Sequence, residues 1–165
     1  MTALLMLDID GVLMLADEAG VARISPVAVS LLNEVIERTG AEVAIISDRR
    51  NTTAPVELFQ MLRDAGLKAC ALTICKPAVS FAEAAADMIH TADPDVFVIV
   101  DDDASRYEGA VALHRGVEVP LSMVVVQPAN RFGLLPNSMP ELCDKLFTPR
   151  FCEPAVLVES ADEDL

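Results

Sequence analysis

The sequence has no tryptophan, one tyrosine and only four cysteines in 165 residues. None of the cysteines forms a CxxC pair, which argues against a structural zinc site. No apolar run approaches the roughly 20 residues of a transmembrane helix, and the first ten residues, MTALLMLDID, lack the basic segment of a signal peptide. We therefore expect no membrane association and a cytoplasmic protein.

Positive charge is also scarce. Twelve Lys and Arg residues stand against 26 Asp and Glu residues, for a formal net charge of −14. This balance disfavours broad binding to a nucleic-acid backbone, which needs a basic surface, but it allows a local basic pocket that grips one phosphate. Apolar residues make up 53% of the chain, too many for a disordered protein. We expect a single domain over residues 1–150, followed by an acidic tail over residues 151–165.

Apolar runs typical of strands alternate with helical patterns along the chain. Strands are predicted at residues 4–7, 42–47, 69–75, 96–100 and 122–126, and helices at 26–39, 55–65, 77–89 and 138–146. A turn signal at Gly20 predicts a hairpin flap over residues 12–24, just after the first strand. The alternation favours a three-layer, Rossmann-like α/β domain with a mainly parallel five-stranded sheet.

Polar residues follow four of these strands. They are Asp8 and Asp10 after the first strand, Ser47, Arg49 and Arg50 after the second, Lys76 after the third, and Asp101 and Asp102 after the fourth. Because ligands bind outside the carboxyl ends of the strands in an open α/β sheet, we expect these side chains to gather at one edge. Residues i and i+2 of a strand share a face, so Asp8 and Asp10 should point the same way.

Several carboxylates at one edge would repel one another. At 4 Å and an effective dielectric constant of 20, each pair of like charges costs about 4 kcal/mol. A hard divalent cation relieves this repulsion, and oxygen ligands suit Mg²⁺, which usually shares its shell with a substrate phosphate. Ser47 and Lys76 would then bind phosphoryl oxygens opposite the metal. The pattern predicts Mg²⁺-dependent chemistry on a phosphorylated substrate.

DIDGV, the Ser47 that follows VAII, the Lys76 before a helix, and VIVDDD resemble the four motifs of the haloacid dehalogenase (HAD) superfamily. The resemblance spans roughly residues 3–146. Within the superfamily, LLNEVIERTGAEVAIISDRRN with ELFQMLRDAGL is similar to the small HAD domains found with RNA-repair proteins. The resemblance implies a hydrolase, a phosphatase that acts on a phosphomonoester such as a nucleotide or a polynucleotide end.

The resemblance also implies a role for each residue. Asp8 would be the nucleophile that forms an aspartyl-phosphate, and Asp10 would protonate the leaving oxygen and later activate water. Ser47 and Lys76 would hold the transferring phosphoryl group. Arg49 and Arg50 would contact a substrate phosphate. The Mg²⁺ ligands would be Asp8, the backbone carbonyl of Asp10, Asp101 and Asp102.

The intervals between the motifs leave no room for a cap domain, because the flap and single helices fill them. A chain without a cap resembles the members of the superfamily that act on large substrates or that close the active site by oligomerising. A homodimer is therefore a further expectation. The alternatives are a HAD-fold protein that binds phosphorylated ligands without turnover, a phosphotransferase, and a phosphorylated switch like a receiver domain. A receiver would need a longer chain after Asp103 than is present.

Overall fold

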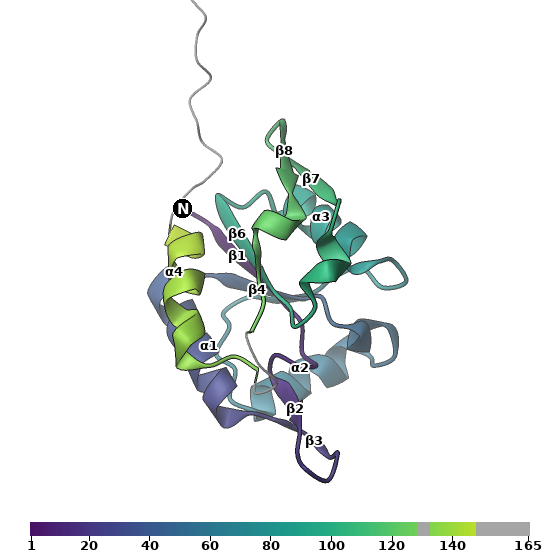
Figure 1. Cartoon of the computed structure of the whole chain (residues 1–165), viewed down its shortest axis with the longest axis vertical. Coiled ribbons are helices and arrows are strands. Elements are labelled where there is room, and N and C mark those ends of the chain that lie inside the picture. Colours follow the sequence, from purple (N-terminus) through teal and green to yellow (C-terminus); the bar gives the residue numbers. More distant parts are fainter. Residues whose placement is uncertain (129–132, 148–165) are drawn as a thin grey trace, which may run out of the picture.

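The computed structural model describes residues 1–128 and 133–147, drawn in colour in Figure 1. The predicted domain over residues 1–150 is thus described over most of its length. The predicted acidic tail at residues 151–165 lies outside the described residues.

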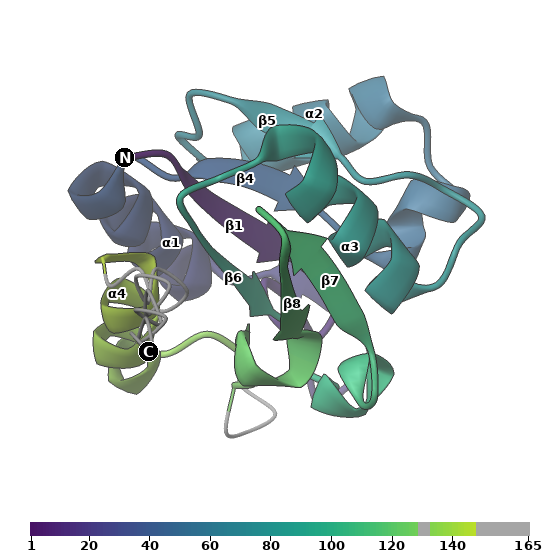
Figure 2. The same cartoon turned by 90° about the horizontal axis from the view of Figure 1, so that it is seen from above.

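A parallel sheet of five strands, in the order β5-β4-β1-β6-β9, forms the centre of the fold (Figure 2). The strands are β1 (Ala3–Leu7), β4 (Glu42–Ile45), β5 (Leu72–Ile74), β6 (Val96–Val100) and β9 (Val125–Val126). Every residue of β1 and β6 is buried, as expected for parallel strands covered on both faces. The predicted five-stranded α/β sheet is confirmed.

Helices and a hairpin cover the two faces of the sheet in three layers. The helices are α1 (Pro26–Thr39), α2 (Pro55–Asp64), α3 (Phe81–Ala92) and α4 (Met139–Phe147). One apolar core joins the sheet to α1, α2 and α4. The other joins it to α3 and to an antiparallel hairpin of β7 (Val111–His114) and β8 (Val117–Pro120), which the sequence analysis did not predict.

Two helix starts show how local chemistry sets the boundaries. Ser25 caps α1 by accepting a hydrogen bond from the Ala28 N–H, as its position before Pro26 predicts. The third helix begins at Phe81, four residues later than predicted. Its N-cap is Ser80, which forms a capping box with Glu83.

The flap is present as predicted, with β2 (Met14–Ala16) paired to β3 (Ala22–Ile24) in an antiparallel hairpin. The fifth strand is shorter than predicted, because a 3₁₀ turn at Leu121–Met123 precedes β9. In the described part of the chain, the intervals between the motifs hold no cap domain. No helix within residues 1–128 or 133–147 is long and apolar enough to cross a membrane.

Candidate active site

Three carboxylates meet at the carboxyl ends of the two central strands. Asp8 follows β1 and Asp101 follows β6, and the pairing of these strands continues into the site through the Asp8 N–H, which donates to the Val100 carbonyl at 2.9 Å. Each of Asp8, Asp101 and Asp102 offers an oxygen, and these oxygens lie within 4.8 Å of one another. The structure therefore brings together three of the predicted metal ligands.

The donor set of this acidic cluster fits Mg²⁺, which binds carboxylate oxygens and water. Asp8 and Asp101 are buried and Asp102 is exposed, so one side of the cluster faces solvent. Gly11, with a φ of +79°, makes room for the cluster, because a Cβ atom there would overlap the Asp102 carboxylate. The Asp10 side chain is not part of this cluster, and the predicted contribution of its backbone carbonyl stays a prediction.

Burial and crowding disfavour the charged form of these acids. Burial, followed by repulsion from Asp101, raises the pKa of Asp8 from its ordinary value of 3.8 to about 6, against the opposing effects of Ser47, Ile9 and Arg106. Burial and Asp101 also raise the pKa of Asp102. The negative charges of the cluster are therefore unfavourable by themselves, and positive charge nearby stabilises them.

Arg106 supplies positive charge to the cluster, and the sequence analysis missed it. Its Nη1 atom donates to Asp8 Oδ2 at 3.0 Å and to Asp101 Oδ1 at 2.9 Å, and it lies 3.8 Å from Asp102 Oδ1. Although burial lowers the pKa of Arg106, Asp101 and Asp8 raise it well above its usual range. The only signal in the sequence is that Arg106 lies one short turn after the run of acids.

Tyr107 is the second residue that the sequence analysis missed. Its buried hydroxyl donates to Asp101 Oδ2 at 2.7 Å. Both Arg106 and Tyr107 lie on the 3₁₀ helix at Ala104–Tyr107, directly after the acids of β6. Tyr107 therefore holds Asp101 through the oxygen that Arg106 does not contact, as the outer hydrogen-bond partner of a metal ligand does.

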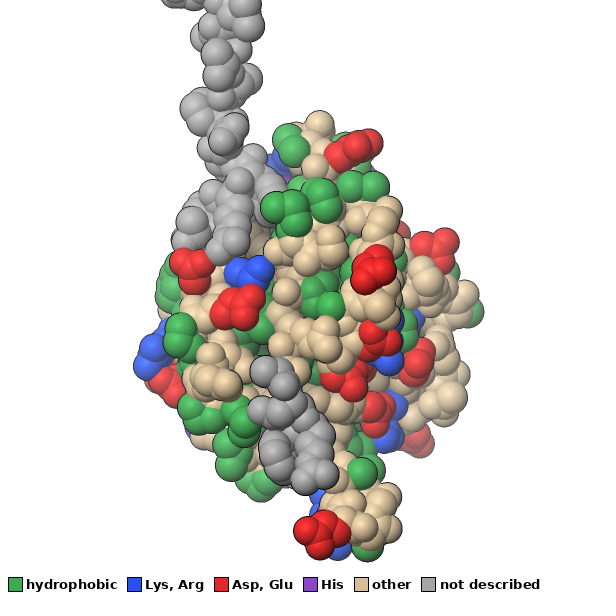
Figure 3. Space-filling view, in the orientation of Figure 1, with side chains coloured by type: hydrophobic (Ala, Val, Ile, Leu, Met, Phe, Trp, Pro, Cys, Tyr) green, Lys and Arg blue, Asp and Glu red, His purple; other side chains and the backbone are tan. Residues whose placement is uncertain are grey.

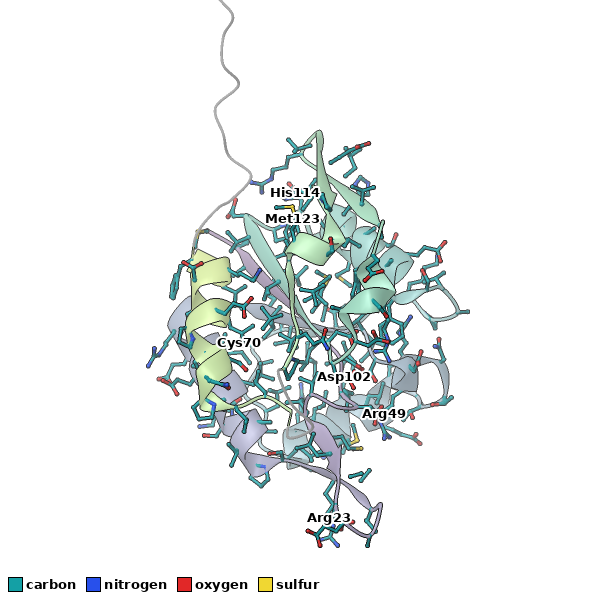
Figure 4. The ribbon with its side chains drawn as sticks, viewed as in Figure 1. Arg23, Arg49, Cys70, Asp102, His114 and Met123 are labelled. Atoms are coloured by element: carbon teal, nitrogen blue, oxygen red, sulfur yellow. The ribbon has the colours of Figure 1, made fainter. Side chains whose placement is uncertain are left out.

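Asp10 and Arg49 form a second, exposed part of the site. Arg49 binds Asp10 in a bidentate pair, with Nε at 2.9 Å from Oδ2 and Nη2 at 2.8 Å from Oδ1. Ser47 is buried, and its hydroxyl donates to Asp10 Oδ2 at 3.5 Å. Figure 4 labels Asp102 and Arg49 on the same side of the fold, where acidic and basic side chains intermix in Figure 3. The structure thus places Ser47 and Arg49 beside Asp10.

Arg50 has a different environment from the one that a substrate contact requires. Its side chain is buried, and its guanidinium donates to the carbonyl oxygens of Ile46, Ser47, Lys76 and Val79. Its Cζ atom also lies 4.8 Å from the centre of the Phe81 ring. These contacts favour a role in joining two loops at the sheet edge rather than the predicted contact with a phosphate.

Lys76 follows β5, at the predicted edge, but its side chain is exposed. Hydrogen bonds from Ser80 lower the pKa of Glu83, and the charge of Lys76 lowers it further. Among the described residues, Lys76 forms no ion pair with the acidic cluster. Its role in phosphoryl binding stays a prediction.

A parallel α/β fold with carboxylates gathered beyond adjacent central strands is the architecture of a HAD-like domain. The family model for the HAD domain in Swiss Army Knife RNA repair proteins matches residues 4–134. The chain therefore belongs to this family. A similar solved structure is 3-deoxy-D-manno-octulosonate 8-phosphate phosphatase from Moraxella catarrhalis, in complex with a magnesium ion, a phosphate ion and KDO. It is 12% identical, has a TM-score of 0.46, and aligns over 87% of this chain and 84% of that chain. No curated protein matches the sequence.

Proposed function

We propose that the protein is a Mg²⁺-dependent phosphatase that transfers a phosphoryl group from a phosphomonoester to Asp8 and then to water. The observation that carries this proposal is the buried Asp8 at the end of the central strand, with Asp101 and Asp102 in reach of the same cation. Mg²⁺ held by these residues and by the Asp10 carbonyl would neutralise phosphoryl oxygens as negative charge develops.

Different side chains carry out the transfer of the phosphoryl group and the hydrolysis of the intermediate. An Asp8 oxygen attacks phosphorus and the bond to the leaving oxygen breaks, while Asp10 donates a proton to that oxygen. Asp10 then takes a proton from water, whose oxygen attacks phosphorus and releases both Asp8 and inorganic phosphate. The Ser47 hydroxyl donates to a phosphoryl oxygen, and Lys76 approaches the same group from the solvent side. Arg49 breaks its ion pair with Asp10 and pairs with the substrate phosphate instead.

The substrate class that we propose is a nucleotide or the phosphorylated end of a polynucleotide. Membership in a family of RNA-repair HAD domains supports it, and the open edge next to Asp102 suits a bulky leaving group. The formal charge of −14 opposes long nucleic acids, so recognition should centre on the terminal phosphate and its neighbours. A cytoplasmic location and a homodimer stay predictions.

The test compares kcat/KM for a mononucleotide, a sugar phosphate, and short oligonucleotides with a 3′- or 5′-phosphate, with Mg²⁺ at fixed salt. We expect hydrolysis that Asp8→Asn and excess chelator abolish, together with a phosphoprotein that borohydride reduces at Asp8 in the wild type. Tight binding of every substrate without turnover would contradict a phosphatase and favour a phospholigand-binding protein. Transfer of the phosphoryl group to an added alcohol, in place of water, would favour a phosphotransferase.

A further inference from the structure

A single nitrogen bridges the two buried acids of the cluster. Asp8 Oδ1 accepts the Ile9 N–H at 2.7 Å, and Asp101 Oδ2 accepts the Tyr107 hydroxyl at 2.7 Å. The other oxygen of each carboxylate, Oδ2 of Asp8 and Oδ1 of Asp101, accepts Arg106 Nη1 at 3.0 and 2.9 Å. The Asp103 N–H also reaches Asp101 Oδ1, at 2.9 Å. Arg106 thus bridges the oxygen of Asp8 that Ile9 does not contact and the oxygen of Asp101 that Tyr107 does not contact, the latter shared with the Asp103 N–H.

We propose that Arg106 is an intrinsic counter-cation, which holds the cation position of the metal-free protein and is displaced when a divalent cation binds. The proposal rests on the metal site of the proposed function. Mg²⁺ binds carboxylate oxygens at about 2.1 Å. A guanidinium nitrogen that bridges the same two oxygens would therefore lie inside the coordination shell of the ion. Two positive charges at that separation would also repel each other strongly.

Arg106 cannot vacate the position by losing its proton, because a guanidinium stays charged in proteins. The side chain must therefore move, and neighbouring residues can hold the guanidinium in a displaced position. The side chain is 30% exposed, and its Nε atom lies 3.6 Å from Oδ2 of Asp103, a half-exposed acid. Its Cζ atom lies 4.3 Å from the centre of the Phe81 ring, which would keep the displaced guanidinium close to the site.

The first experiment measures Mn²⁺ binding by electron paramagnetic resonance in the wild type and in three Arg→Met variants. Arg106→Met removes the proposed competitor. Arg49→Met removes a positive charge that also lies near Asp8 but that pairs with Asp10 instead of bridging the acidic cluster. Arg115→Met removes an exposed arginine paired with Asp93 and Asp95, before the start of β6.

We expect Arg106→Met to tighten Mn²⁺ binding by about tenfold or more, the factor that corresponds to losing a charge-assisted hydrogen-bond competitor. Arg49→Met should tighten it less, and Arg115→Met should leave it unchanged. An equal gain for Arg106→Met and Arg49→Met would show that only net charge matters and would overturn the proposal, while the metal site would stand. Absence of Mn²⁺ binding in every variant would instead remove the metal site and the proposed function with it.

A second measurement needs no variant. Crystal structures of the wild type grown with and without Mn²⁺ should show the ion among Asp8, Asp101 and Asp102. In the Mn²⁺ structure, Arg106 Nη1 should lie beyond hydrogen-bonding distance of the first two acids. Mn²⁺ at this position with both Arg106 hydrogen bonds intact would overturn the displacement, even if Arg106→Met fails to fold.

Discussion

Replacement of Asp8 by Asn removes a charge that the folded protein holds at a cost. Burial, with a further contribution from Asp101, raises the pKa of Asp8 from 3.8 to about 6. Since each tenfold change in a proton dissociation constant corresponds to about 1.4 kcal/mol, ionised Asp8 lowers the free energy of unfolding by up to about 3 kcal/mol. The attraction of Arg106 is already included in this net shift, but burying the polar amide without a full set of hydrogen-bond partners offsets part of the gain. We expect Asp8→Asn to stabilise the metal-free protein by about 1–2 kcal/mol, or several degrees in Tm for a chain of this length.

The sign of the pH dependence follows from the direction of the shift. Because the pKa of Asp8 is higher in the folded state than in the unfolded state, the folded state binds more protons between about pH 4 and pH 6. The contribution of Asp8 to wild-type stability therefore falls as the pH rises through this window. The side-chain amide of the variant does not titrate, so the advantage of Asp8→Asn should be small at pH 4 and complete above pH 7.

Urea unfolding in excess chelator from pH 4 to pH 8 measures the stability gained by Asp8→Asn and its dependence on pH. Asp95→Asn is the matched control, because hydrogen bonds from Thr2 and Arg115 lower the pKa of Asp95 to about 2. Ionised Asp95 therefore stabilises the folded protein above its unfolded pKa of 3.8, and this stabilisation is lost as the pH falls to about 2. Asp95→Asn should therefore destabilise the protein at neutral pH. An Asp8→Asn variant that is less stable than the wild type at pH 7, or whose advantage does not change with pH, would refute the electrostatic account.

Three further variants test the site. Ser47→Ala removes the hydroxyl that we propose as a donor to the transferring phosphoryl group and should lower kcat about 10²-fold in steady-state kinetics, with little change in Tm. Tyr107→Phe removes the hydroxyl that holds Asp101 and should weaken Mg²⁺ binding about 10–100-fold in calorimetry. Gly11→Ala should displace a carboxylate of the acidic cluster and abolish Mg²⁺ binding. Gly40→Ala, which has the same left-handed backbone but open space around it, should cost stability alone. Equal metal affinities for the two glycine variants would contradict the steric argument.

Local chemistry made most of the fold predictable from the sequence. Ser25, Pro26 and Gly40 mark the ends of α1 because each satisfies or replaces backbone groups at a helix terminus. The hairpin of β7 and β8 was missed because its strands are short, and β7 alternates exposed and buried residues over only four positions, Val111–His114. Such a run carries too few periods to be distinguished from a loop.

The acids of the site were predictable because strand direction alone brings them to one edge. Asp8 and Asp101 follow neighbouring parallel strands, so the register of the sheet fixes their separation. The contacts of Arg106 were not predictable, because they depend on the path of the chain after β6 through a 3₁₀ turn. Sequence patterns predict which helices and strands form more reliably than they predict which groups a long side chain contacts.

Arg50 shows why a residue next to a motif need not touch the substrate. An arginine after the Ser47 motif is an obvious partner for a phosphate, but four backbone carbonyls accept its N–H groups. These carbonyls come from the loop after β4 and from the loop that leads into α3, so Arg50 joins the two. The ring of Phe81, at the start of α3, contacts both Arg50 and Arg106, with its centre 4.8 and 4.3 Å from their Cζ atoms. The arginine that holds the loops and the arginine that contacts the acids therefore pack against the same aromatic ring.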